Sequence, residues 1–193
     1  MSKRIDYHPD FYVNRYYHVY NRAVGHDKLF YNDENYKYFL KRYSYYLHNH
    51  VKAYSFCLLP NHFHLLISSI HDSSEIIIEQ FRKFFISYSM SINLQLKRKG
   101  NLFQSNFKRK IIDDEKYLLQ AVYYIHANPV HHKIEMDLEK YKFSSYKIVI
   151  ADKKTELQRN DVLDWFSGRK SFINFHRDYK SADHADDYLI EDE

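Results

Sequence analysis

Residues 51–68 have the sequence VKAYSFCLLPNHFHLLIS and determine the architecture of this chain. Two apolar runs flank Pro60-Asn61, and each is rich in the aromatic, β-branched and aliphatic residues typical of strands. Proline and asparagine stop the first run, because proline donates no main-chain hydrogen bond and asparagine favours turns. We therefore predict strands over 51–59 and 62–68, joined as a tight hairpin that lies in the middle of a sheet.

Further elements flank this hairpin on both sides. Residues 16–22 (YYHVYNR) are aromatic and β-branched without helical spacing, which predicts a first strand. Apolar residues at three-and-four spacing predict helices over about 32–49 and 73–98. Residues 101–112 (NLFQSNFKRKII) are predicted to be extended.

A third helix is predicted to begin after Asp113 or Asp114 and to run to Asn128. Pro129 is expected to end it, because a proline inside a helix removes a hydrogen bond. The resulting order is β-α-β-β-α-β-α. Its first six elements are those of the ferredoxin-like split βαβ, which places two helices on one face of an antiparallel sheet. The predicted fold class is α+β, with short C-terminal helices.

The length of 193 residues suits one well-buried core with an extension, and is short for two enzyme domains. We predict a main domain over residues 1–135, a C-terminal helical extension over 136–182 and an acidic tail over 183–193. The formal charge is +4, and removing the six acids of the tail raises it to +10. A basic body suits a polyanionic partner, although an ordinary charged surface explains it equally well.

Cys57 is the single cysteine, so no disulfide framework can form and a reducing, cytoplasmic setting is expected. The N-terminal sequence MSKRIDYHPD lacks the apolar segment of a signal peptide. No stretch approaches the roughly 20 apolar residues of a membrane helix. These features predict a soluble protein without a membrane partner.

His62 and His64 stand two residues apart on a predicted strand, so both side chains leave one face while Phe63 and Leu65 leave the other. Neutral imidazoles at this separation can bind one divalent cation. Two ligands make an incomplete site, so a third must come from elsewhere. A chance pair among 13 histidines is the competing interpretation.

Residues 117–129 (YLLQAVYYIHANP) place Tyr124 and Asn128 four residues apart, on one face of the third predicted helix. This spacing allows an amide oxygen to bind a metal while a phenol one turn earlier points at a substrate on the same ion. Tyr123 has Ala127 at the equivalent position, so Tyr124 is the better candidate. The simpler interpretation is a packed aromatic residue and a helix-ending asparagine.

Five segments carry a resemblance to a known family. They are YHVYNR (17–22), LPNHFHLL (59–66), GNLFQ (100–104), YIHANPV (124–130) and SSY (144–146). In this order, over residues 16–147, they resemble the HUH-type single-tyrosine transposases, and among these the REP-associated tyrosine transposases. One departure is HHK at 131–133, where family members often have an Arg-Ala-Gly stretch, and this leaves the local DNA contacts open.

The resemblance implies a metal-dependent endonuclease and strand transferase, acting in DNA transposition or recombination. Its implied substrate is single-stranded DNA that folds into a hairpin. The resemblance assigns His62, His64 and Asn128 to Mg²⁺ or Mn²⁺ and makes Tyr124 the nucleophile. The implied product is a 5′-phosphotyrosine link with a free 3′-hydroxyl, which allows the strand to be rejoined without ATP. The active species is expected to be a monomer or a homodimer.

Basic residues bracket the GNLFQ segment and supply cations for DNA phosphates, while an aromatic residue between them can stack on unpaired bases. The alternative is a solvated helix end followed by an ordinary strand. The candidate DNA-binding residues are Arg22, Arg82, Lys97, Arg98, Lys99, Phe103, Lys108, Arg109 and Lys110.

Three other functions remain open. A non-catalytic single-stranded nucleic-acid-binding module with a ferredoxin-like fold explains the basic surface, but leaves the histidine pair and Tyr124 unused. A zinc hydrolase needs an acidic ligand or base, for which Glu75 and Asp113 are the candidates. A domesticated family member that cuts and rejoins chromosomal repeats differs from a mobile-element transposase only in its flanking DNA.

Overall fold

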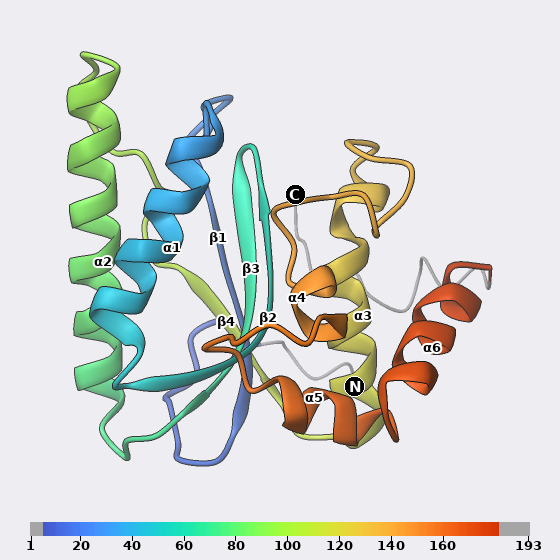
Figure 1. Ribbon diagram of the computed structural model, residues 1–193. Coiled ribbons are helices and arrows are strands. Elements are labelled where there is room, and N and C mark those ends of the chain that lie inside the picture. Colours follow the sequence, from blue (N-terminus) through green and yellow to red (C-terminus); the bar gives the residue numbers. More distant parts are fainter. Residues whose placement is uncertain (1–5, 182–193) are drawn as a thin grey trace, which may run out of the picture.

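The structure is a computed structural model that describes residues 6–181, so the predicted acidic tail lies outside the described residues. Strands and helices fall close to the predicted ranges (Figure 1). In chain order the elements are β1 (Tyr16–Arg22), α1 (Asp33–Leu47), β2 (Val51–Leu59), β3 (His62–Ser69), α2 (Ser74–Gln95), β4 (Lys108–Ile112), α3 (Glu115–His131), α4 (Tyr146–Ile150), α5 (Arg159–Trp165) and α6 (Arg169–Ser181).

The strands of the described chain form one antiparallel sheet in the order β2-β3-β1-β4. This is the strand order of the ferredoxin-like split βαβ, which confirms the predicted fold class. The expectation that both hairpin strands lie in the middle is wrong for β2, which is an outer strand. After β1 the chain crosses over through α1 to β2, which lies two positions away from β1 in the sheet. The next strand, β3, folds back and fills the position between β2 and β1.

A segment from the C-terminal part of the chain covers the outer edge of β2. The Leu58 N–H donates to the Phe143 carbonyl at 3.0 Å, and the Ser145 N–H donates to the Phe56 carbonyl at 2.9 Å. The Phe56 N–H donates in turn to the Ser145 hydroxyl at 2.8 Å. These bonds satisfy main-chain groups that an open edge would expose to other strands.

The sheet separates two apolar cores. As predicted, α1 and α2 cover one face, and α3 with the C-terminal helices covers the other (Figure 1). Alternation along β3 divides its side chains between the two cores, because successive residues leave opposite faces. Phe63 and Leu65 pack in the core beneath α1 and α2, whereas Leu66 packs beneath α3.

The helix α3 continues beyond Asn128, so the prediction that Pro129 ends it is wrong. Proline in the last turn removes a single N–H donor, and its fixed φ suits a helix. The main-chain carbonyls of this turn still accept hydrogen bonds. The His132 N–H donates to the Asn128 carbonyl at 3.0 Å, and the Ile134 N–H donates to the Pro129 carbonyl at 2.8 Å. The three extra residues keep Asn128 inside regular helix.

A chain of buried hydrogen bonds joins α3 to α6. His126 Nδ1 lies 2.9 Å from His176 Nε2, and His126 Nε2 lies 2.7 Å from the Ser145 hydroxyl. His176 Nδ1 lies 2.8 Å from the Phe172 carbonyl, to which it must donate. Burial lowers the pKa of His126 well below its ordinary value and lowers the pKa of His176 to about 4. Both imidazoles are therefore neutral at pH 7.

These low pKa values predict that the fold loses stability in acid. The pKa of His176 is lower in the folded chain than in the unfolded chain, so its contribution is complete above about pH 6.5 and is lost as the pH falls towards 4. We expect the free energy of unfolding to fall by about 3 kcal/mol from this group alone. Urea unfolding at pH 7.5 and pH 4 measures the loss.

The matched variants for this test are His176→Gln and His26→Gln. The first removes a buried imidazole that titrates, and the second removes an exposed one. His176→Gln should reduce the difference in stability between the two pH values, whereas His26→Gln should leave it unchanged. An equal difference in wild type and His176→Gln would exclude this origin of the acid sensitivity.

Candidate active site

The strand β3 directs His62 and His64 to the face of the sheet that α3 covers. In the register of β1 and β3, Arg22 pairs with His62 and Tyr20 pairs with His64. Both histidines are buried, with exposed fractions of 8% and 0%. The alternation that the sequence predicted therefore holds, and the imidazoles face a helix and not open solvent.

Main-chain bonds fix the hairpin turn that precedes His62. The Pro60 carbonyl accepts from the N–H groups of Leu29 and Phe30 at 2.7 and 3.0 Å, and the Asn61 carbonyl accepts from the Ala23 N–H at 2.8 Å. The donors belong to the loop between β1 and α1. The position of His62 is thus set by the sheet on one side and by this loop on the other.

The helix α3 brings Tyr124 and Asn128 to the histidines. Asn128 Oδ1 lies 3.4 Å from His62 Nε2, and the Tyr124 ring lies 5.7 Å from the His64 ring, centroid to centroid, in an edge-on arrangement. The two α3 residues share one helical face because they are four positions apart. The structure therefore brings all four predicted residues together within a single chain.

Hydrogen bonds indicate the protonation of His62. Its Nδ1 lies 2.7 Å from Asn61 Oδ1, which can only accept, so Nδ1 carries the proton. The Asn128 amide donates through Nδ2 to the Tyr124 carbonyl at 3.3 Å, which leaves Oδ1 as an acceptor facing His62. His62 Nε2 and Asn128 Oδ1 lie 3.4 Å apart, so these two predicted ligand atoms are neighbours.

His18 was not identified from the sequence, yet it contacts the site directly. Its Nε2 lies 2.8 Å from His64 Nδ1, and its ring stacks on Tyr20 at 5.0 Å. One of the two histidines donates to the other, so this bond fixes the ring orientation of His64. Alternation along β1 puts His18, Tyr20 and Arg22 on one face, but only the pairing of β1 with β3 shows that this is the face of His62 and His64.

The HHK departure at residues 131–133 also lies at the site. The His132 ring stands 4.6 Å from the His62 ring, and the His131 ring stands 5.8 Å from the Tyr124 ring. Because α3 runs three residues further than predicted, these imidazoles adjoin the candidate ligand and the candidate nucleophile. The departure therefore changes the immediate surroundings of the site.

Three predicted DNA-binding residues lie on the histidine face, which is the face of the sheet from which His62 and His64 project. Arg22 pairs with His62 across β1 and β3, whereas Lys108 and Lys110 on β4 pair with Tyr20 and His18. Directly paired residues project from the same side of a sheet. These three cations therefore project from the sheet on the side of the histidine pair.

The structure contradicts the DNA-binding assignment of Arg109. It lies on the opposite face of β4, is 6% exposed, and its guanidinium lies 5.0 Å from the Phe11 ring. Its Nε donates to the Pro9 carbonyl at 2.5 Å, and its Nη2 donates to the His8 carbonyl at 3.0 Å. Burial lowers the pKa of Arg109, but the group stays charged. Arg109 attaches the N-terminal segment to the sheet.

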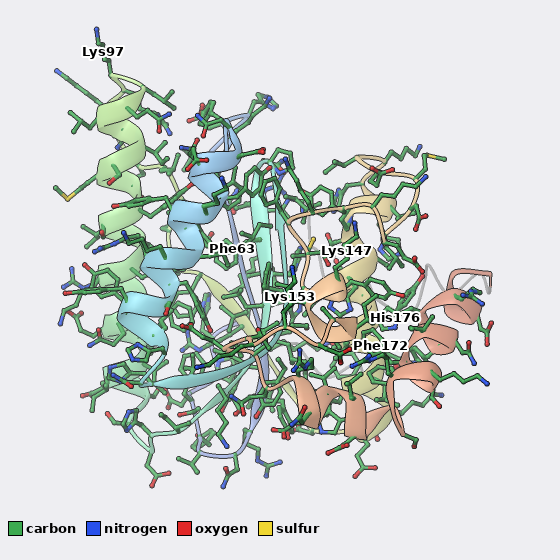
Figure 2. All side chains as sticks on the ribbon, in the orientation of Figure 1. Phe63, Lys97, Lys147, Lys153, Phe172 and His176 are labelled. Carbon is green, nitrogen blue, oxygen red and sulfur yellow. The ribbon has the colours of Figure 1, made fainter. Side chains whose placement is uncertain are left out.

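The remaining candidates lie on the α1 and α2 side of the sheet. Figure 2 shows Lys97 at the end of α2, far from α3, and Lys99 follows it as an exposed residue. Arg98 pairs with Asp27, and Arg82 pairs with Glu79 at 2.6 Å. Phe103 is 8% exposed and packs against Phe85 at 4.8 Å between ring centroids.

The acidic residues that a zinc hydrolase would need lie elsewhere. Glu75 is exposed in the first turn of α2, and Asp113 is exposed beside Arg15 at 3.6 Å. Within residues 6–181 no group of three or more His, Cys, Asp and Glu side chains is placed to hold a metal ion. The Asn128 amide is the third predicted ligand, and its Oδ1 lies 3.4 Å from His62 Nε2.

Arg109→Ala should destabilise the fold, because it leaves two carbonyls of the N-terminal segment without their charged donor. We expect a loss of about 2–3 kcal/mol in the free energy of unfolding, measured by urea denaturation. Lys99→Ala, which removes an exposed cation, should change it by less than about 0.5 kcal/mol. An Arg109→Ala protein as stable as wild type would refute the structural role.

Comparisons with known proteins identify the fold. No family model and no curated protein matches the sequence. In the described chain, no helix is both long and apolar enough to cross a membrane. Among solved structures, a REP-associated tyrosine transposase bound to a REP hairpin is similar, with a TM-score of 0.61 and 18% sequence identity over 88% of this chain and 98% of that one. The chain therefore shares the fold of a REP-associated tyrosine transposase.

Proposed function

We propose that the chain is a metal-dependent endonuclease and strand transferase that cuts hairpin-forming single-stranded DNA through Tyr124. The observation that carries the proposal is the convergence of His62, His64, Tyr124 and Asn128 from β3 and α3 in one chain. The shared fold supports it, because the similar solved protein is a tyrosine transposase bound to a DNA hairpin.

The donor set fits a divalent cation. His62 Nε2 and Asn128 Oδ1 lie 3.4 Å apart, and His64 lies beside His62 with perpendicular rings 5.1 Å apart. If His64 Nδ1 donates to His18, the lone pair of His64 lies on Nε2, as a ligand requires. Two imidazoles and an amide suit Mn²⁺ at least as well as Mg²⁺. When bound, such an ion polarises a phosphate and neutralises its charge.

Tyr124 is the proposed nucleophile. Its phenol oxygen attacks the phosphorus, a new P–O bond to Tyr124 forms, and the bond to the 3′ oxygen breaks. The phenol proton passes to water, and the departing oxygen takes up a proton from water to become a 3′-hydroxyl. The phosphodiester bond energy is retained in the 5′-phosphotyrosine, so a second 3′-hydroxyl can attack it and release Tyr124. No nucleotide cofactor is consumed.

The chain's cations position the DNA. Arg22, Lys108 and Lys110 lie on the histidine face and can hold the phosphates on either side of the one that reacts. Holding the strand in line with Tyr124 removes most of the orientational cost of the attack. A non-catalytic binding module would use the same cations but would not require Tyr124 or the histidine pair.

Tyr124→Phe should abolish the covalent adduct. Labelled single-stranded hairpins are incubated with the protein and Mn²⁺, and the products are separated on a denaturing gel. The adduct should fall at least about 1,000-fold, because the substitution removes the attacking oxygen. Hairpin affinity should remain, because the ring is retained.

Tyr123→Phe is the matched control for this experiment. The Tyr123 ring faces His176 at 5.6 Å and not the histidine pair, so its adduct should equal that of wild type. An adduct that persists in Tyr124→Phe would exclude Tyr124 as the nucleophile. A wild-type protein that binds hairpins without forming any adduct would favour the binding module.

His62→Ala and His64→Ala should each remove cleavage and lower Mn²⁺ affinity, because each takes away one of three ligands. A loss of at least about 10-fold in affinity is expected from calorimetric titration of Mn²⁺. EDTA should stop cleavage by the wild-type protein. His26→Ala, at an exposed position outside the site, should leave both properties unchanged. Cleavage that is insensitive to EDTA would refute the metal requirement.

A further inference from the structure

A second pair of histidines lies at the end of the sheet opposite the candidate active site. His50 directly precedes β2, and His71 follows the end of β3 by two residues. Along β3 the distance from His62 to Ser69 is about 23 Å, because a strand rises about 3.3 Å per residue. Figure 1 shows the turn between β2 and β3 at the top, and the junctions of α1 with β2 and of β3 with α2 at the bottom. The proposed cleavage uses neither His50 nor His71.

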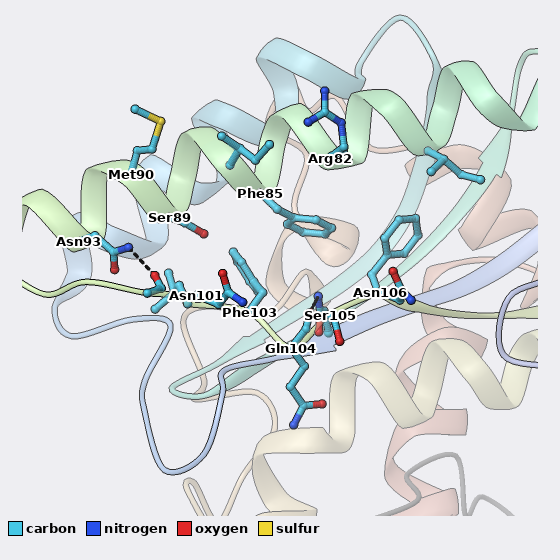
Figure 3. Close-up of a pocket in the computed structure, with 16 residues that line it drawn as sticks. Arg82, Phe85, Ser89, Met90, Asn93, Asn101, Phe103, Gln104, Ser105 and Asn106 are labelled. Carbon is cyan, nitrogen blue, oxygen red and sulfur yellow. Dashed lines mark hydrogen bonds between the residues drawn. The ribbon is translucent and has the colours of Figure 1, made fainter.

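This pair is separate from the cavity of about 520 Å³ between α2 and the segment 100–107 (Figure 3). Phe85 and Phe103 pack against each other there, with ring centroids 4.8 Å apart. Of the described residues that line the cavity, none is a His, Cys, Asp or Glu. The cavity therefore lacks the imidazole, thiolate and carboxylate groups that bind transition metals.

Main-chain hydrogen bonds hold His50 and His71 close to each other. The His50 N–H donates to the Leu47 carbonyl at 2.9 Å, and the His50 carbonyl accepts from the Ile70 N–H at 3.2 Å. The Ser69 hydroxyl donates to the His71 carbonyl at 2.6 Å and accepts from the His71 N–H at 3.0 Å. Both side chains therefore extend from a backbone that is already fixed.

The two imidazole rings stand at a separation that one metal ion can bridge. Their centroids lie 5.1 Å apart, with an angle of 45° between the ring planes. A metal–nitrogen bond of about 2.0–2.1 Å and a tetrahedral angle place two ligating rings with their centroids about 5.2 Å apart. The proposed ligands His62 and His64 have the same centroid separation of 5.1 Å.

A hydrogen bond assigns the tautomer of His71. Its Nε2 lies 3.1 Å from the Asn49 carbonyl oxygen, which can only accept, so Nε2 carries the proton of the neutral ring. The lone pair of the neutral ring is then on Nδ1. Histidines that bind metals typically donate their other ring N–H to a carbonyl or a carboxylate in this way. His71 is therefore oriented as a metal ligand is.

His50 supplies an independent observation. Its Nδ1 is buried and has no hydrogen-bond partner within residues 6–181. A buried ring nitrogen without a partner is costly, whether it carries a proton or a lone pair. Burial and three neighbouring basic groups lower the pKa of this imidazole, which is therefore neutral at pH 7, as a metal ligand must be. These groups are His71, His48 and Lys83.

The nearby Lys83 ammonium does not prevent a cation from binding. Its Nζ lies 3.7 Å from Glu79 Oε1, and the two side chains are 47% and 40% exposed. The Glu79 carboxylate opposes the positive charge, and the surrounding solvent screens what remains of it.

We propose that His50 and His71 bind one divalent transition-metal ion, with water at the remaining coordination positions. Paired imidazoles favour ions such as Zn²⁺ over Mg²⁺, which prefers oxygen ligands. The ion bridges the start of β2 and the segment after β3, and so closes the end of the β2–β3 pair that has no turn. Its role is to stabilise the sheet, and the inference does not depend on the proposed cleavage.

Calorimetric titration of Zn²⁺ tests the site. The parent protein is the full chain with His62→Ala and His64→Ala, so that the proposed active-site ligands do not contribute. The parent should bind Zn²⁺, and adding either His50→Gln or His71→Gln should lower its affinity at least about 10-fold, because one of two imidazoles is lost. Either variant alone is sufficient if the other proves unstable.

His48→Gln in the parent is the matched control. It removes an exposed histidine of the same segment that makes no printed-length contact with the His50 and His71 rings, and it should change the Zn²⁺ affinity by less than about 2-fold.

Thermal unfolding gives a second readout. Zn²⁺ at about 100 times its dissociation constant should raise the Tm of the parent by at least about 5 °C. The rise should be less than about 2 °C in the parent with His71→Gln. The new amide keeps an N–H donor for the Asn49 carbonyl, so the lost hydrogen bond of the imidazole does not explain the difference.

The contrary outcomes are specific. A parent that binds no Zn²⁺, or whose affinity neither His50→Gln nor His71→Gln lowers, would refute the site. An equal loss of affinity in His48→Gln would also refute it, because the effect would not be specific to the two facing rings. None of these results bears on cleavage through Tyr124, since the parent lacks the proposed active-site histidines.

Discussion

The pairing of β1 with β3 is the constraint on which the rest of the structure depends. It places His18 and Tyr20 beside the histidine pair on one face and leaves Phe63 and Leu65 for the opposite core. A shift of one residue in this register would exchange the two faces. The apolar core beneath α1 and α2 opposes such a shift, because it would have to accept the imidazoles in place of Phe63 and Leu65. The packing of one face thereby fixes the position of the histidine pair on the other.

The helix α3 carries Tyr124 and Asn128, which form the second half of the site. Its position depends on residues far along the chain. Tyr124 and Asn128 stay opposite the histidines because α3 packs on the sheet and is joined to α6 through His126 and His176. The proposed reaction needs the nucleophile and the ligands aligned closely. The C-terminal helices therefore contribute to the site without supplying a side chain to it.

Local patterns allowed the elements and the central residues to be predicted from the sequence. Alternation along 62–68 was enough to place His62 and His64 on one face, and the four-residue step linked Tyr124 to Asn128. Contacts between strands were not predictable, because the register of β1 and β3 is set by packing and not by any local signal. His18 was missed for that reason. Arg109 was misassigned because its sequence neighbours, two lysines, suggest a surface while its own face of β4 is buried.

The location of the basic residues on β4 has another consequence. This strand ends the sheet on the side opposite β2, and an unprotected outer strand invites pairing with other chains. The Arg109 N–H already donates to the Tyr7 carbonyl at 2.9 Å, and the flanking lysines repel the same strand of a second molecule. The cations that suit a nucleic acid thus also oppose edge-to-edge pairing of this strand. Neutralising Lys108 and Lys110 would therefore affect solubility as well as the proposed binding of DNA.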